Sequence, residues 1–140
     1  MECYVSCDSD KLNVEMIHDY LANRSYWRKG FGLEKLKIAI ANSLCFGVYL
    51  KSTDEQVGFA RVLSDKVTFA YIEDLFILEE YRGNGFSKKL MKSIMEHEDL
   101  QNLQRWTLLT NDAHTLYSKF GFKQIAHPER FMEIVGPVPK

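Results

Sequence analysis

The stretch Tyr71-Ile-Glu-Asp-Leu-Phe-Ile-Leu-Glu-Glu-Tyr-Arg-Gly-Asn-Gly-Phe-Ser-Lys-Lys-Leu-Met-Lys-Ser-Ile-Met95 decides the fold, because its pattern changes halfway along. Its first part belongs to a segment, Phe69 to Leu78, that is rich in aromatic and β-branched residues, as a largely buried strand should be. After a glycine turn the apolar residues take helical spacing with one buried face, at Phe86, Leu90, Met91, Ile94 and Met95. The stretch therefore predicts a strand, a turn and an amphipathic helix.

The turn itself, Arg82-Gly83-Asn84-Gly85, has the properties of an anion-binding site. Glycines let the backbone approach a ligand closely, the first amides of a helix are unpaired donors, and the helix dipole favours negative charge there. Lys88 and Lys89 follow in the first helical turn, where cations are better explained if a polyanion docks beside them. The stretch matches neither the dinucleotide fingerprint nor the P-loop pattern, so a plain strand-to-helix turn is the alternative on this stretch alone.

A second stretch, Thr110-Asn-Asp-Ala-His-Thr-Leu-Tyr-Ser-Lys-Phe-Gly-Phe122, follows a short apolar strand and ends on Gly-Phe. With both stretches in hand, the sequence resembles the GNAT superfamily of acetyl-CoA-dependent N-acetyltransferases. One motif of that family is a strand ending in Q/R-x-x-G-x-G/A before a helix, and the other looks like N-x-x-A-x-x-L-Y-x-x-x-G-F. Counted from Arg82, Ser87 replaces the last Gly or Ala, and the second motif is one residue short between Asn111 and Ala113.

The resemblance covers residues 44 to 135 or so and implies a fold. It implies a single-domain α/β GNAT-like fold with a mixed central sheet flanked by helices. In that fold the central strand and the strand after the helix splay apart and form the acyl-CoA cleft. The resemblance also implies acetyl-CoA as the acyl donor.

Composition narrows the class of protein. The 140 residues suit one domain, which we place at 1–135 with a tail at 136–140. Apolar residues make up 46%, charged residues 26%, and the net charge is −1, which gives no reason to expect nucleic acid as a partner. No apolar run is long enough to cross a membrane, so we expect neither membrane spans nor a signal peptide. The three cysteines lack a C-x-x-C pair, and we expect reduced thiols in a cytoplasmic protein.

The order of the remaining elements is also predicted. We expect a strand over 2–6, a helix capped at Ser9 or Asp10 that ends near Leu21, and a helix over 33–43. The predicted strands are 44–51 and 56–64, joined as a hairpin, then 69–78 and 106–109, and a final pair at 122–125 and 131–135. The helix after the central turn should end near Glu98, and another should span 112–120 with Gly121 as its left-handed cap.

The chemistry expected of the family identifies the candidate catalytic residues. An amine attacks a thioester only when it is neutral, so the enzyme needs a proton acceptor and a donor for the departing thiolate. By resemblance, Tyr117 is the general acid, with helix packing as its alternative role. We choose Glu73 as the base over Asp74, since neighbours on a strand face opposite ways and Glu73 shares a face with Tyr71. His114 is a weaker proton relay, because a histidine on a helix beside solvent is usually only surface.

The resemblance also indicates, residue by residue, what would bind the two substrates. The strand backbone at Leu75, Phe76 and Ile77 would bind the pantetheine amides, and Asn111 would reach the same arm. The pyrophosphate would lie among residues of the turn and the helix start: Arg82, Gly83, Asn84, Gly85, Phe86, Ser87 and Lys88. Tyr26 and Trp27 are the first candidates for the acceptor pocket, joined by Tyr20, Phe31, Arg24, Arg28, Arg130 and Glu133. Simple coverage of the core is the alternative role for these aromatics.

We therefore expect transfer of an acetyl group from acetyl-CoA to a primary amine, preferably of a small molecule. Direct attack in a ternary complex is expected, because Cys45 lies in an apolar strand without an obvious basic neighbour to activate it. No metal site is expected, since the histidines and cysteines lack ligand spacing. The alternatives are acetylation of a lysine or N-terminal amine of a peptide or protein, and a degenerate domain that senses acyl-CoA. Many relatives dimerise, so a homodimer is possible.

Overall fold

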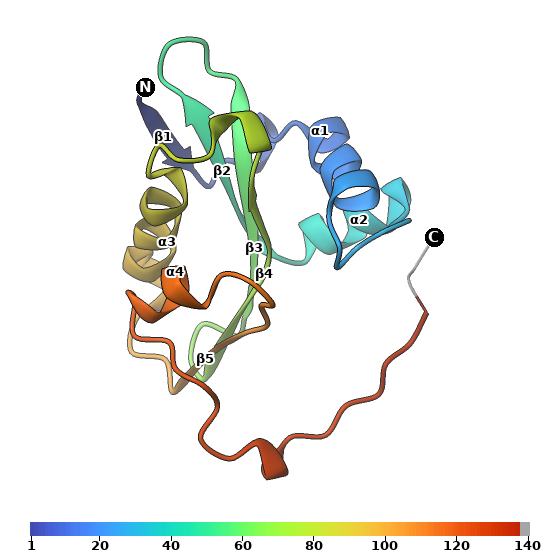
Figure 1. The fold of residues 1–140 in the computed structure, drawn as a ribbon, viewed down its shortest axis with the longest axis vertical. Coiled ribbons are helices and arrows are strands. Elements are labelled where there is room, and N and C mark those ends of the chain that lie inside the picture. The colour runs from blue at the N-terminus through green and yellow to red at the C-terminus, as the bar shows by residue number, and fades with distance from the viewer. Residues whose placement is uncertain (138–140) are drawn as a thin grey trace.

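The computed structural model describes residues 1–137 and places one β-sheet between two groups of helices (Figure 1). The sheet has five strands in the order β1-β2-β3-β4-β5, with antiparallel pairs up to β4 and a parallel β4–β5 pair. The α/β architecture with a mixed sheet is therefore as predicted. The strands are β1 (Cys3–Ser6), β2 (Leu44–Leu50), β3 (Gln56–Ser64), β4 (Phe69–Ile77) and β5 (Arg105–Leu108).

The helices are short and lie on opposite sides of this sheet. In Figure 1, α1 and α2 lie on one side, and α3 and α4 lie on the other. Their bounds are α1 (Val14–Asp19), α2 (Leu33–Ala41), α3 (Phe86–Glu96) and α4 (His114–Ser118). Single turns occur at Ser9–Lys11, Glu79–Tyr81, Glu98–Leu100 and Pro128–Arg130. No helix among residues 1–137 is both long and apolar enough to cross a membrane.

The core forms on both faces of the sheet, which is why β2 and β3 are almost continuously apolar. Every residue of β2 after Leu44 is buried, and so is β3 from Gln56 to Val62. The apolar side of α3 contributes four buried residues, Phe86, Leu90, Met91 and Ile94, as its helical spacing predicts. Burial on this scale is the main stabilising term for the fold.

The two central strands separate partway along, and this separation positions the site. The register of β4 with β5 runs from Phe69 opposite Arg105 to Ile72 opposite Leu108 and stops there. β4 continues to Ile77, whereas the chain leaves β5 at Leu109. Within residues 1–137, the edge of β4 from Glu73 to Ile77 therefore has no strand partner on this side, and the splayed strands are as predicted.

A β-bulge interrupts β4 at the same place. Phe59 lies opposite Phe76 and Arg61 lies opposite Glu73, so β4 has one residue more than β3 across this interval. Asp74 takes the left-handed conformation there, with φ of 56°. Aspartate tolerates that conformation better than most residues, so a charged residue occupies the bulge without a glycine.

Two expectations about the ends of the chain are wrong. The first helix is not capped at Ser9 or Asp10: its cap is Asn13, whose side chain accepts a hydrogen bond from the Met16 amide, and a π-helical turn extends it over Tyr20–Arg24. The predicted final strands at 122–125 and 131–135 are absent, because the described chain offers them no strand partner. Of the predicted tail at 136–140, residues 138–140 lie outside the described part of the chain.

Candidate active site

The gap between the splayed strands opens into a cavity of about 820 Å³. One wall is the free edge of β4, and the opposite wall is the segment 109–113 that follows β5 together with Tyr117 of α4. The π-helical turn and the loop after it cover the third side through Tyr20, Arg24, Tyr26, Trp27 and Arg28. Ser87 of α3 and Arg82 line the end nearest the glycine turn. One cavity thus joins all these elements.

The glycine turn is built as the sequence predicts. Gly83 and Gly85 have φ of 82° and 77°, in the left-handed region that favours glycine. Gly85 is the N-cap of α3, and within the described chain no side chain caps this helix end, so its first amides are left as free donors. A small hollow of about 60 Å³ lies here, and Ile77, Arg82 and Ser87 line both it and the main cavity. This end of the cavity can therefore accept an anion.

Arg82 folds back toward β4 instead of extending into solvent. Its Nε donates to the carbonyl oxygen of Ile77 over 3.0 Å, and its guanidinium also donates to the Tyr20 hydroxyl over 2.7 Å. The Tyr20 ring in turn stacks on Phe76, with ring centroids 3.9 Å apart. The guanidinium is thus fixed at the point where the cavity meets α3.

The other residues predicted for the anion site do not share one environment. Phe86 is buried in the core and lines the small hollow, and the Asn84 side-chain amide donates to the Tyr81 carbonyl over 3.0 Å. Lys88 is exposed and, like Asn84, lines neither cavity. Lys89 donates to the Cys3 carbonyl over 3.0 Å, so it binds β1 and does not face the turn as expected.

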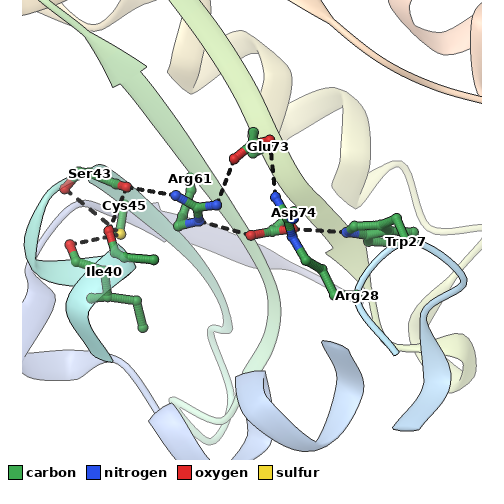
Figure 2. A network of polar contacts seen from close by, with 9 residues as sticks. Trp27, Arg28, Ile40, Ser43, Cys45, Arg61, Glu73 and Asp74 are labelled. Carbon is green, nitrogen blue, oxygen red and sulfur yellow. Dashed lines mark hydrogen bonds and ion pairs between the residues drawn. The ribbon is translucent and has the colours of Figure 1, made fainter. Parts of the chain in front are cut away.

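Two carboxylates and two arginines form a network at the bulge of β4 (Figure 2). Arg61 of β3 donates to Asp74 over 2.8 Å and to Glu73 over 2.7 Å. Arg28 donates to the same two carboxylates over 3.0 Å each, and Trp27 Nε1 donates to Asp74 over 2.9 Å. The Asp74 side chain is fully buried, whereas Glu73 retains 17% exposure. Each buried charge is therefore paired.

This network corrects the expectation that Glu73 and Asp74 face opposite ways. The left-handed residue in the bulge breaks the alternation of the strand, and both carboxylates reach the same two guanidiniums. Sequence reasoning also missed Arg61, although a charged residue inside an otherwise apolar strand was a visible signal. The consequence is that Asp74 fixes the loop carrying Trp27 and Arg28 over the cavity.

Tyr117 lies in the cavity wall as a buried residue. Its ring packs edge-on against Phe122, with centroids 6.0 Å apart. Burial, with smaller contributions from nearby Tyr26 and Asp112, raises the pKa of the Tyr117 phenol to about 12. Tyr26 also accepts a hydrogen bond from the Asn111 amide over 3.2 Å, which ties the covering loop to the segment after β5. Tyr117 is therefore protonated at neutral pH and can donate a proton.

The predicted acceptor residues divide into two groups. Tyr26 and Trp27 line the cavity together with Tyr20, Arg24 and Arg28. Phe31 is buried under the Arg28 guanidinium instead, and Arg130, Glu133 and the exposed His114 do not line the cavity. The C-terminal residues fail to reach it because the predicted strands that would carry them are absent.

Two further expectations concern Cys45 as a nucleophile and the His, Cys, Asp and Glu side chains as metal ligands. Cys45 lies opposite Arg61 across the β2–β3 pair, so it does have a basic neighbour, contrary to expectation. Burial nevertheless outweighs that charge and raises the pKa of the Cys45 thiol to about 12, which leaves it unreactive as a nucleophile. Among residues 1–137, no cluster of three or more His, Cys, Asp or Glu side chains could hold a metal ion.

Comparison with known proteins agrees with this geometry. The profile of the acetyltransferase (GNAT) domain matches residues 41–124. A crystal structure of a candidate GNAT-family acetyltransferase from Xanthomonas campestris pv. campestris superposes with a TM-score of 0.93 at 44% identity, covering 98% of this chain and 95% of that one. A candidate acetyltransferase of Gibberella zeae is 32% identical over 133 residues, which span 82% of this chain and 75% of that protein.

A further relative is an uncharacterised N-acetyltransferase of Gracilaria tenuistipitata var. liui. It is 31% identical over 94 residues, which span 64% of this chain and 52% of that protein. The family profile covers more than half of the chain, and the matched residues 41–124 include the glycine turn and Tyr117. The chain is an N-acetyltransferase and belongs to the GNAT family.

Proposed function

We propose that this enzyme transfers an acetyl group from acetyl-CoA to the primary amine of a small molecule, by direct attack in a ternary complex. The observation that carries the proposal is the single cavity of about 820 Å³. It connects the start of α3 at Ser87 with the buried phenol of Tyr117 and with the aromatic loop at Trp27. An anion site, a proton donor and an acceptor pocket therefore share one space.

The donor end of the cavity fits acetyl-CoA, which supplies the reactive thioester when bound. The free edge of β4 at Leu75, Phe76 and Ile77 presents backbone groups that a pantetheine arm can pair with in place of a strand. The uncapped amides of α3 and the fixed Arg82 guanidinium suit its phosphates. Asn111 lines the cavity on the opposite wall, where it can reach the same arm.

Tyr117 and Glu73 would divide the proton transfers between them. As the amine nitrogen bonds to the acyl carbon and the carbon–sulfur bond breaks, Tyr117 gives its proton to the departing thiolate. Glu73 takes the proton lost by the amine, through a water molecule, and solvent then restores both groups. Glu73 is better placed than Asp74 for this role, because only its carboxylate retains exposure.

The arginine pairs limit how strongly Glu73 can act. Each Glu73 carboxylate oxygen already accepts a hydrogen bond, Oε1 from Arg28 and Oε2 from Arg61, so less of its accepting capacity remains for the water molecule that relays the proton. We therefore expect Glu73→Gln to lower kcat/KM for the amine by about 10- to 100-fold, at the low end for a general base. Steady-state kinetics at saturating acetyl-CoA measure this, and an unchanged kcat/KM would remove Glu73 from the mechanism.

The acceptor is identified by thiol release from acetyl-CoA against a panel of amines. The panel contains polyamines, arylalkylamines, aminosugars and amino acids, with lysine peptides and peptides bearing free N-termini as the second group. The aromatic side chains of Tyr26 and Trp27 in the cavity lining lead us to expect release with a small amine that has an apolar body. Release only with peptides would favour the peptide alternative. No thiol release with any amine of the panel, together with measurable acetyl-CoA binding, would favour an acyl-CoA sensor. The presence of Ser87 where the family motif has Gly or Ala also motivates that alternative.

A further inference from the structure

The arginines that line the cavity are already paired or lie at its donor end. Arg28 donates to Glu73 and to Asp74 over 3.0 Å each (Figure 2). Arg24 likewise pairs with two carboxylates, and Arg82 lies at the end of the cavity that suits the phosphates of acetyl-CoA. Within residues 1–137, no lysine or histidine lines the cavity. An acceptor with a carboxylate or phosphate group would therefore have to break an existing ion pair in order to bind there.

Asp112 gives the cavity a carboxylate that is not paired. It lies on the wall that follows β5, and it is exposed. Its backbone amide bonds to the Thr110 hydroxyl, but within the described chain no hydrogen bond or ion pair involves its carboxylate. A carboxylate without a partner attracts cations into the space that it lines. This wall of the cavity therefore favours a positively charged group of the acceptor over a negatively charged one.

Two aromatic rings lie close to the same wall. The Tyr26 hydroxyl accepts a hydrogen bond from the Asn111 amide over 3.2 Å, which places this ring beside the residue that precedes Asp112. Trp27 contacts the Tyr26 ring edge-on, with centroids 5.0 Å apart, and its indole donates to Asp74 over 2.9 Å. Within residues 1–137, no lysine or arginine lies over either ring. Because the faces of such rings attract cations, the rings and the carboxylate independently indicate a cationic group.

We propose that the acceptor is a diamine or polyamine, whose second ammonium group lies against Tyr26 and Trp27 with Asp112 as its counter-charge. This inference rests on the proposed function, because the first amine is the one that accepts the acetyl group. Both amines are protonated in water at neutral pH. The reacting amine loses its proton near Glu73, whereas the distant amine keeps its charge. The methylene chain between the two amines supplies the apolar body that suits the aromatic lining.

The size of the expected preference follows from the two contacts of the second ammonium group. A cation–π contact and an ion pair at exposed positions each strengthen binding by about 2- to 5-fold. A diamine should therefore exceed the amino alcohol of the same chain length by about 5- to 25-fold in kcat/KM. The amino acid of that length should be poorer than the amino alcohol, because its carboxylate would meet Asp112 as a like charge.

Initial rates of thiol release from acetyl-CoA test this inference with α,ω-diaminoalkanes of increasing length. Each diamine is matched by the amino alcohol and the amino acid of the same chain length. We expect kcat/KM to fall in the order diamine, amino alcohol, amino acid. In Asp112→Asn the preference for the diamine over the amino alcohol should shrink by about 2- to 5-fold. In Glu34→Gln, which removes an exposed acid of α2 outside the cavity lining, the preference should persist.

The outcomes separate this inference from the proposed function. Equal kcat/KM for diamines and amino alcohols would overturn the inference and leave the acetyl transfer standing. A preference for the amino acids would overturn it in the same way, and so would a preference for diamines that Asp112→Asn leaves unchanged. No product with any of these amines from a protein that acetylates other amines would also overturn only the inference. A protein that acetylates no amine at all would overturn the proposed function and this inference together.

Discussion

Tyr117 shows how burial keeps a phenol protonated. The phenol lies in the wall of the cavity, and its pKa is raised to about 12, first by burial and then by Tyr26 and Asp112. A general acid must hold its proton before the reaction, and the Tyr117 phenol does so at any pH below its pKa of about 12. The motif around Leu116 and Tyr117 selected this tyrosine from sequence, and the structure places it in the cavity lining, while its role as the acid stays a prediction. Its burial and its neighbours depend on how α4 packs.

The pH dependence of the reaction follows from this value. The substrate amine is neutral only above a pKa near 10, so kcat/KM should rise with pH as more of the amine loses its proton. Tyr117 remains protonated throughout, so no descending limb should appear up to about pH 10. Initial rates across this range measure the profile, with circular dichroism at each pH to confirm folding. A rate that falls with a midpoint below pH 10 would show that Tyr117 is not the donor, or that it is far more acidic than its burial implies.

Asp74 and Arg61 show what sequence reasoning could not reach. The pattern identified Glu73 and Asp74 as candidates, but strand alternation placed them on opposite faces. The bulge at Asp74 reverses this, and a bulge depends on how two strands register, which no local pattern records. Arg61 pairs with Glu73 and Asp74 of the neighbouring strand, and the strand register that brings them together could not be predicted from the sequence either.

Removal of the Asp74 charge should destabilise the protein. In Asp74→Asn the side chain keeps its size and its tolerance of the left-handed backbone, but the buried Arg61 loses a counter-charge. Breaking a buried ion pair in this way costs about 3 kcal/mol of unfolding free energy, measured by urea denaturation. Glu79→Gln is the control, because its pair with Arg24 is exposed and should cost less than about 1 kcal/mol. Equal stability of the two variants would contradict a structural role for the network.

At the scale of elements, the strand–turn–helix unit of β4 and α3 was predictable almost residue by residue. Both glycines adopt the left-handed conformations that the turn requires, and the helix buries the predicted face. These features are local, so the sequence records them directly. The place where β4 leaves β5 is different, because it is set by the register of two strands that are distant in sequence.

The glycine turn can be tested separately from its effect on folding. Gly85 and Gly30 have nearly the same φ, 77° and 75°, and open space around any added Cβ, so alanine at either position causes similar strain, about 1 kcal/mol. Only Gly85→Ala also disturbs the amides at the start of α3, so it should weaken acetyl-CoA binding by about 10-fold. Calorimetric titration of each variant measures this. Equal effects of the two substitutions on affinity would contradict an anion site at this helix end.

For the whole molecule, the order of elements along the chain predicted the mixed sheet and its helices. The failure lies at the C-terminus, where the apolar residues at 131–135 indicated a strand that the described chain does not form. A strand pattern records which residues can be buried in a sheet, but it does not record whether a neighbouring strand is there to pair with them.

We propose that Tyr117 in this cavity drives transfer of acetyl from acetyl-CoA to an amine. The decisive experiment compares thiol release and acetylated-amine product for the wild type, Tyr117→Phe and the control Tyr4→Phe, which lies outside the cavity lining, with acetyl-CoA binding measured for each. We predict product from the wild type and the control, and a kcat about 10²-fold lower for Tyr117→Phe with unchanged acetyl-CoA affinity. Full activity in Tyr117→Phe, or no acetylated product from a wild type that binds acetyl-CoA across the amine panel, would contradict it.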